Sequence, residues 1–266
     1  MKIEYQETSK DLQTRIDIHN RYGSRDIDAW MLDLLRPAKG SRILDVACGA
    51  GKQLAAFHRY TGGVSEIVGV DVSQPLLDQA ANLNAQLGNP FTLRSMDFNA
   101  EFPFESDSFD LVSCCFALYY AADAGFTLRQ MHRVLKPGGR LFTTGPMPEN
   151  KKLFYDVIRE ATGKAIPPMP GSSRYASEML TAMRGLFASV EVHVFENPLV
   201  FEAVPPFLDY TRASLSEDRK LWGGLFSGSE EFEDVMGRIS QAAARRLSES
   251  GKLVMTKIVG GFVATK

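Results

Sequence analysis

The sequence predicts an α/β protein built on a doubly wound, mostly parallel, Rossmann-like sheet with added helical segments. Apolar, β-branched strand segments alternate with helical segments over residues 42–144, a pattern typical of a parallel sheet that is covered on both faces. In the run ILDVACGAG at residues 43–51, the first strand leads directly into a small-residue turn and then into a helix. Glycine in such a turn lets the backbone approach a ligand closely. A nucleotide-like ligand is therefore expected.

Seven strands are expected in chain order, and three helical segments lie between strands among the first five. The helices lie near residues 52–60, 75–87 and 124–135, and the third stops at the sequence KPGG, a strong helix-ending signal. The predicted strands cover residues 42–47, 66–70, 91–94, 111–116, 140–144, 190–195 and 258–263.

Helical segments flank the predicted sheet. A helix is expected near residues 150–162, then a Pro/Gly/Ser loop at 166–173, then a helix that begins with Ser177 as its N-cap. Residues 204–250 are again helical. The predicted organisation is an N-terminal helical lid at 1–39, a cofactor-binding core at 40–146, a lid insertion at 147–175, a core continuation at 176–203, a helical lid insertion at 204–250 and a last core strand at 251–266.

Composition excludes several classes of protein. The 30 basic and 32 acidic residues give a formal net charge of −2, so neither nucleic acid nor an anionic membrane is an expected partner. The polar, acidic start of the chain argues against a secretory signal. The three cysteines form no CxxC pair and the four histidines lack ligand spacing, so no disulfide framework and no metal site are expected. We expect a cytoplasmic monomer or homodimer.

Acidic and aromatic residues recur where the predicted parallel strands end. Asp45 precedes the glycine turn, Asp71 ends the next strand, and Asp97 with Phe98 follows the third. In an open parallel sheet, ligands bind outside the carboxyl ends of the strands. An acid in the position of Asp71 can hold a ribose, and Asp97 can accept from an exocyclic amine. Each residue alone fits an ordinary turn or cap, but their order and register together predict an adenosine pocket.

In these motifs the chain resembles the class I S-adenosylmethionine-dependent methyltransferases. The resemblance rests on ILDVACGAG, on VGVDVSQPLLDQA (69–81), on SMDFNAEFPFESDSFDLVSC (95–114) and on RQMHRVLKPGGRLF (129–142). It covers residues 40–145 and implies a seven-stranded sheet with an antiparallel last strand and S-adenosyl-L-methionine as the cofactor. The family most often has glycine where this chain has Ala47.

The resemblance also implies roles for the matching positions. The turn at 45–51 would face the methionine portion of the cofactor, Asp71 the ribose and Val72 one face of the adenine. Asp97 would accept from the adenine amine, and the backbone near 114–116 would meet the ammonium group. The cofactor-binding residues that follow are Asp45, Ala47, Gly49, Gly51, Asp71, Val72, Asp97, Phe98, Cys114 and Phe116.

The chemistry of methyl transfer requires few catalytic side chains. A sulfonium methyl group is already a strong electrophile, so the enzyme mainly aligns the reactants and excludes water. The chain has FALYY at 116–120 in place of the Asn/Asp-Pro-Pro-Tyr/Phe run of amino-directed nucleic-acid and protein methylators, which favours a free small molecule over a flipped base. Polar residues of the three predicted lid segments and of the fourth strand's end are expected at the acceptor. The catalytic candidates are Tyr22, Tyr119, Tyr120 and Glu149, and Tyr5, Arg174, Tyr175 and Tyr210 are further candidates for substrate contact.

The sequence thus predicts an enzyme that transfers a methyl group from S-adenosylmethionine to an oxygen or nitrogen of a small-molecule acceptor and releases S-adenosylhomocysteine. A carbon acceptor stays open. So do a non-catalytic S-adenosylmethionine-binding regulatory or partner subunit, an NAD(P)-dependent oxidoreductase, and a methyltransferase with an RNA or protein acceptor. The missing third glycine of G-x-G-x-x-G and the position of Asp45 argue against the oxidoreductase.

Overall fold

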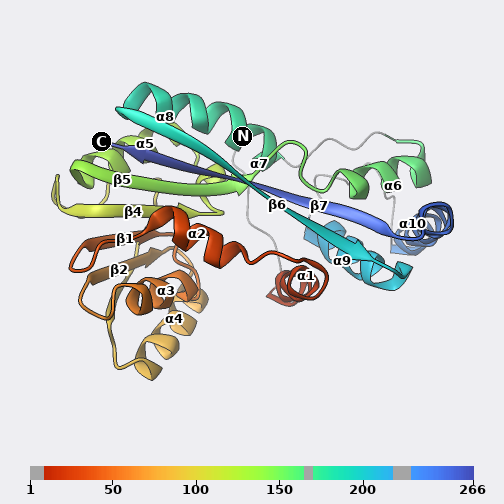
Figure 1. Ribbon diagram of the computed structural model, residues 1–266, viewed down its shortest axis with the longest axis horizontal. Helices are drawn as coiled ribbons and strands as arrows, with labels where there is room; N and C mark the ends of the chain where they lie inside the picture. The colour runs from red at the N-terminus through yellow and green to blue at the C-terminus, as the bar shows by residue number, and fades with distance from the viewer. Residues whose placement is uncertain (1–8, 165–169, 218–228) are drawn as a thin grey trace.

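A seven-stranded sheet organises the protein in the computed structural model, which describes residues 9–164, 170–217 and 229–266 (Figure 1). The strand order is β3-β2-β1-β4-β5-β7-β6. The first five strands are parallel, and β7 runs antiparallel to both β5 and β6. The predicted fold class is therefore confirmed. The strands are β1 Arg42–Val46, β2 Glu66–Asp71, β3 Phe91–Ser95, β4 Phe109–Cys115, β5 Leu135–Pro146, β6 Ser189–Phe201 and β7 Leu253–Thr265.

Helices cover both faces of the sheet, because alternate strand residues point to opposite sides. Leu44 of β1 belongs to the apolar cluster under α5 and α8, whereas its neighbour Ile43 belongs to the cluster under α2, α3 and α4. The helices on the first face are α5 Ala124–Val134, α7 Pro170–Arg174 and α8 Leu180–Leu186, and those on the second are α2 Ile27–Leu35, α3 Lys52–Tyr60 and α4 Gln74–Gln86.

The helix expected to begin at Ser177 instead runs without a break from α7 through a π-helical turn, Tyr175–Met179, into α8. Tyr175 explains the wider turn. Its ring occupies the space above Gly145 and Gly260, where an added Cβ would lie 2.5 Å and 3.2 Å from the ring. The ring stacks on Phe262 at 4.4 Å between centroids, and its hydroxyl lies 2.9 Å from Thr143 Oγ1. Tyr175 is fully buried by these contacts, so the structure gives it a packing role, and its expected contact with substrate stays a prediction.

Strands β6 and β7 are about twice as long as predicted and continue past the end of β5. Pairing of β5 with β7 ends at Pro146–Val259, whereas the β6–β7 ladder runs on to Phe201–Leu253. We call the part beyond β5, residues 196–201 and 253–258, the hairpin arm. Four helices gather around it: α1 Ser9–Tyr22, α6 Lys152–Thr162, α9 Val204–Glu217 and α10 Ser229–Ser250 (Figure 1).

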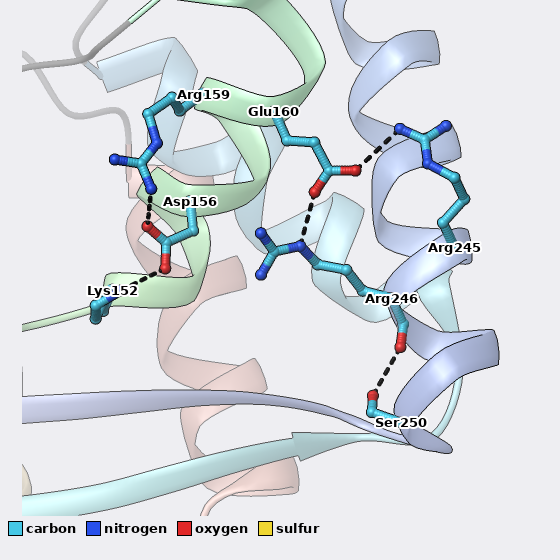
Figure 2. Close-up of polar contacts among 7 residues, drawn as sticks. All are labelled: Lys152, Asp156, Arg159, Glu160, Arg245, Arg246 and Ser250. Atoms are coloured by element: carbon cyan, nitrogen blue, oxygen red, sulfur yellow. Dashed lines mark hydrogen bonds and ion pairs between the residues drawn. The ribbon is translucent and has the colours of Figure 1, made fainter.

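The hairpin arm and these four helices share one apolar core, and together we call them the lid lobe. Phe154 and Phe207 are fully buried there, as are Phe201 and Met255 of the arm. Ion pairs join α6 to α10 on its exposed surface, where Glu160 accepts from Arg245 at 3.0 Å and Arg246 at 2.8 Å (Figure 2). Exposed pairs of this kind contribute little, so the lid lobe is held mainly by its apolar core.

Asn197 ties the N-terminal segment to the hairpin arm. Its side-chain oxygen accepts from the backbone N–H groups of Ser24 at 3.0 Å and Arg25 at 3.2 Å, and its amide donates to the carbonyl of Arg25 at 3.1 Å. The Trp30 side chain packs against the sheet at Gly261, in the space that a side chain at that position would fill. These contacts fix α1 beside α9, next to the carboxyl ends of the core strands (Figure 1). Within the described ranges, no helix combines the length and the apolar character needed to cross a membrane.

Candidate functional site

Asp71 links the ends of β1 and β2. Its Oδ2 accepts from the N–H of Gly49 at 2.8 Å, and its Oδ1 accepts from the N–H of Ser73 at 2.8 Å. The side chain is buried and each oxygen is oriented by a backbone donor. The carboxylate therefore has a fixed direction at the carboxyl edge of the sheet, where a ribose would bind.

Three residues of the turn after β1 adopt the left-handed backbone conformation: Ala47 at φ +58°, Gly49 at φ +53° and Gly51 at φ +82°. A Cβ added at Gly51 would lie 3.1 Å from the Cβ of Ala80, so this glycine permits α3 to pack on α4. A Cβ added at Gly49 would meet nothing within 4 Å. Gly49 thus borders open space at the strand ends, as a backbone that approaches a ligand should.

Asp45 lies behind this turn and is almost completely buried. It accepts a 2.6 Å hydrogen bond from Ser113 Oγ of the neighbouring strand β4. Burial raises the pKa of Asp45 to about 7, against the hydrogen bond from Ser113, and the charge of Asp71 raises it further. A cationic ligand beside Asp45 would favour the ionised carboxylate. Two buried acids thus make this wall of the site suited to a positive charge.

The predicted adenine-binding residues lie beside Asp71. Val72 is 67% exposed, so an apolar surface is open to solvent next to a buried carboxylate. Asp97 is exposed, and its Oδ1 accepts from the N–H of Asn99 at 2.9 Å and from its side-chain amide at 2.8 Å. Phe98 is half-buried against the core. Val72, Asp97 and Phe98 are all near the carboxyl edge of β2 and β3, which suits a flat ring bound there.

The end of β4 contributes backbone rather than side chains. The Cys114 side chain is buried in the core, and burial raises the pKa of its thiol well above the ordinary value. Phe116 adopts φ +56° and donates its N–H to the carbonyl of Thr144 at 3.0 Å. The chain then turns into a short 3₁₀ helix, Leu118–Tyr120. Cys114 is thus excluded as a reactive thiol, whereas the backbone of 114–116 does reach the strand ends.

The catalytic candidates lie in different parts of the structure. Tyr119 and Tyr120 lie side by side, 4.6 Å between ring centroids. Tyr22 instead packs on Phe201 in the lid lobe at 5.1 Å, and Glu149 is exposed beyond the end of β5.

The further candidates for substrate contact have other roles where they are described. Arg174 donates to the carbonyls of Tyr119 at 3.0 Å and Ala121 at 2.6 Å, so it fixes the loop after β4. Tyr210 is 1% exposed in the lid core. Tyr5 lies outside the described residues.

Sequence reasoning missed a set of residues on the lid side. His19 of α1 is half-buried, with its ring edge-on to Tyr210 at 5.4 Å between centroids. Lys151, just before α6, is 5% exposed, and Lys257 of the hairpin arm lies over the ring of Phe116 with Nζ 5.6 Å from its centroid. Single lysines and histidines in helical or alternating segments give no local signal of such convergence.

Comparison with known proteins agrees with this geometry. Residues 43–139 match the family model described as a methyltransferase domain. The ubiquinone/menaquinone biosynthesis C-methyltransferase UbiE of Pectobacterium atrosepticum is 32% identical over 150 residues, which cover 53% of this chain and 60% of that protein. A demethylmenaquinone methyltransferase of Staphylococcus aureus is 37% identical over 101 residues, covering 38% of this chain and 41% of that protein. The chain thus spans at most about 60% of these curated relatives.

Solved structures share the fold at low sequence identity. The YcgJ protein of Bacillus subtilis matches with a TM-score of 0.59 and 18% identity, covering 90% of this chain and 97% of that one. A putative methyltransferase of Bacillus halodurans matches with a TM-score of 0.57 and 18% identity, covering 90% and 98%. These likenesses cover more of the chain than residues 43–139.

Proposed function

We propose that this chain, a member of the class I S-adenosylmethionine-dependent methyltransferase family, transfers a methyl group from S-adenosylmethionine to a small organic acceptor. Membership in the family, predicted from the four sequence motifs, agrees with the methyltransferase-domain match over residues 43–139. The observation that carries the proposed activity is the arrangement inside that segment. The open turn at Gly49, the oriented carboxylate of Asp71 and the buried acid Asp45 meet at one edge of the sheet.

The residues present fit S-adenosylmethionine. Asp71 would accept from the ribose hydroxyls, Val72 would pack on the adenine, and Asp45 would face the cationic methionine portion. When bound, the cofactor would supply a sulfonium methyl group, which is electrophilic toward an electron-rich atom of the acceptor. The chain then has to orient the acceptor in line with that bond and keep water out.

The lid lobe provides the second wall of the proposed reaction site. Helix α1 is fixed beside the strand ends by Asn197, and Arg174 fixes the loop that carries Tyr119 and Tyr120. Both contacts act on segments that would cover a bound acceptor. Orientation and exclusion of water are therefore the roles that we assign to these elements.

The acceptor atom is proposed to be carbon. The relative from Pectobacterium atrosepticum is named as a C-methyltransferase, and its similarity covers 53% of this chain. The oxygen or nitrogen acceptor expected from the sequence remains the second candidate. Incubation with S-adenosylmethionine that carries a ¹³C-labelled methyl group decides between them, because the ¹³C chemical shift separates C-, N- and O-methyl products. A demethylated quinol and a panel of phenols and amines are the first acceptors to test.

Binding of S-adenosylhomocysteine tests the cofactor site directly. Calorimetry should give micromolar affinity, and Asp71→Ala should weaken binding by about 1–3 kcal/mol through the loss of a buried hydrogen bond. Asp78→Ala is the matched control, because Asp78 is an exposed acid of α4 whose side chain accepts from Gln74. Equal affinity of wild type and Asp71→Ala would refute the ribose assignment, and binding of NAD in place of S-adenosylhomocysteine would refute the proposed function.

A further inference from the structure

Asn99, in the loop after β3, uses both polar atoms of its side chain. The side-chain nitrogen donates to Oδ1 of Asp97 at 2.8 Å, and the side-chain oxygen accepts from the backbone N–H of Ala122 at 2.7 Å. An amide nitrogen can only donate a hydrogen bond and an amide oxygen can only accept one. A single orientation of the Asn99 amide therefore satisfies both partners.

The two oxygens of the Asp97 carboxylate have different environments. Oδ1 accepts from the backbone N–H of Asn99 at 2.9 Å as well as from the Asn99 side chain. Oδ2 makes no hydrogen bond to the residues that the structure describes. Asn99 thus holds Asp97 by one oxygen and leaves the other as an oriented acceptor at the predicted adenine end of the candidate site.

The hydrogen bond between Asn99 and Ala122 joins two loops whose strands are not neighbours. Strands β2 and β1 lie between β3, which precedes Asn99, and β4, which precedes Ala122. A second bond has the same effect, since Thr127 Oγ1 of α5 donates to the carbonyl of Phe98 at 3.1 Å. The loop after β3 is thus tied at two adjacent points to the chain that follows β4.

The loop after β4 is also held by Arg174. The Arg174 guanidinium donates to the carbonyls of Tyr119 at 3.0 Å and Ala121 at 2.6 Å. Glu178 accepts from the same guanidinium at 2.9 Å and 3.1 Å, which fixes its direction. Two side chains therefore hold this loop, and Asn99 is the one that also contacts the predicted adenine acid.

We propose that Asn99 is a positioning residue that makes the cofactor site selective for a 6-aminopurine. It orients Asp97 so that Oδ2 accepts from the exocyclic amine, and Ala122 in turn fixes the Asn99 amide. Recognition of the amine and the position of the loop after β4 then depend on the same side chain. This inference rests on the proposed function, because it requires S-adenosylmethionine as the ligand. A hypoxanthine ring, with a carbonyl oxygen in place of the amine, would set two acceptors against each other.

The first arm of the test compares S-adenosylhomocysteine with S-inosylhomocysteine, in which a carbonyl oxygen replaces the amine. In calorimetry, wild type should bind S-adenosylhomocysteine about tenfold tighter or more, because the analogue loses a hydrogen bond to a charged group. Asn99→Ala and Asn99→Asp should reduce this preference to about threefold or less, through weaker binding of S-adenosylhomocysteine. Asn82→Ala is the matched control, because Asn82 is an exposed asparagine of α4, and it should keep the wild-type preference.

The second arm separates the two hydrogen bonds of the Asn99 side chain. Asn99→Asp retains an oxygen that can accept from the Ala122 N–H but removes the amide donor to Asp97. Hydrogen exchange of the Ala122 amide, followed by NMR, should therefore match wild type in Asn99→Asp and be about tenfold faster or more in Asn99→Ala. A lost preference in Asn99→Asp with Ala122 still protected shows that Asn99 acts through Asp97.

An unchanged preference in Asn99→Asp, or a wild type that binds both ligands equally, would overturn the proposal. A preference lost only where Ala122 exchanges faster would make Asn99 a purely structural residue and would overturn it too. Asn99 is half-buried in a loop, so both variants should fold, and an unchanged affinity for S-inosylhomocysteine verifies this in the same titration. A wild-type protein that binds neither ligand would refute the proposed function instead, so the two failures remain distinct.

Discussion

The two walls of the candidate site differ in how their side chains are held. On the core side, short parallel strands end in Asp45 and Asp71, and hydrogen bonds from Ser113 and from the Gly49 backbone orient these acids. On the lid side, the long side chains of Lys151 and Lys257 lie over aromatic rings contributed by distant segments. The core wall is thus specified by local backbone geometry, and the lid wall by tertiary packing. The side chains of the two walls can therefore change independently in sequence.

The largest expected effect is a loss of stability in the lid lobe alone, caused by Phe207→Ala. Phe207 is fully buried in the lid core, 6.0 Å from Phe201 between ring centroids. Its truncation should lower the free energy of unfolding by about 3–5 kcal/mol, measured by urea denaturation. Hydrogen exchange should rise in α1 and α9 but little in β1 and β2, and affinity for S-adenosylhomocysteine should stay within twofold. Uniform loss of protection across the sheet would mean that the lid lobe and the core are one cooperative unit.

Gly49→Ala should weaken cofactor binding at the core wall and leave the lid lobe unchanged. The added methyl group would occupy the open space at the turn, so affinity for S-adenosylhomocysteine should fall about 10–100-fold, or about 1.4–2.8 kcal/mol. Gly40→Ala is the matched control, because Gly40 also has a positive φ with no neighbour within 4 Å and lies at the opposite end of β1. Both variants should lose about 1 kcal/mol of stability. Equal loss of affinity in the two would show that backbone strain, and not blocked space, is responsible.

The pH dependence of binding should report the charge of the core wall. Asp45 has a pKa of about 7 in the ligand-free protein, and the ammonium group of a bound ligand would lower it. Below pH 7, binding of S-adenosylhomocysteine then releases a proton from Asp45. The affinity for S-adenosylhomocysteine should therefore rise by up to about tenfold per pH unit as the pH approaches 7, and level off above pH 7. Calorimetry in buffers of different ionisation enthalpy measures that proton. Asp45→Asn should show neither effect, and a flat profile for wild type between pH 5.5 and 8 would contradict the assignment.

The raised pKa of Asp45 also affects the stability of the folded protein. The pKa of Asp45 is raised above its ordinary value of 3.8, so the folded protein binds this proton more tightly than the unfolded chain. Between 3.8 and about 7 the unfolded state loses the proton first, and stability falls as pH rises through that window. Denaturant midpoints of wild type and Asp45→Asn should therefore diverge with rising pH, with the variant the more stable at pH 8.

The smallest expected effect is a gain in the free energy of unfolding, from a substitution at Ala47. Ala47 holds a left-handed conformation at φ +58°, which disfavours residues with a Cβ. Ala47→Gly should stabilise the protein by about 0.5–1 kcal/mol in urea denaturation, after the greater entropy of glycine in the unfolded chain is subtracted. Ala50→Gly in the same turn lacks a positive φ to relieve and should destabilise instead. A loss of stability in Ala47→Gly would show that its methyl group contributes packing to the turn.

Sequence reasoning succeeded where structure is specified locally. Strand β1, the glycine turn and helix α3 lie within one or two residues of their predicted bounds, because strand, turn and helix signals follow one another there. The hairpin arm was missed because Asn197 and Pro198 interrupt the apolar pattern. Proline is tolerated at this point because β6 is an edge strand, and Asn197 is buried because it bonds to Ser24 and Arg25. Contacts between residues more than 150 positions apart leave no local signature.

The hairpin arm also determines how the chain segment between its two strands joins the sheet. Phe201 and Leu253 face each other at the last rung of the ladder, so the inserted segment between them leaves and rejoins the sheet at a single point. Closing a chain between two fixed neighbouring ends becomes only slightly harder as the segment lengthens. We therefore expect that helices of other lengths grafted at this rung would leave the strands that carry Asp45 and Asp71 in register.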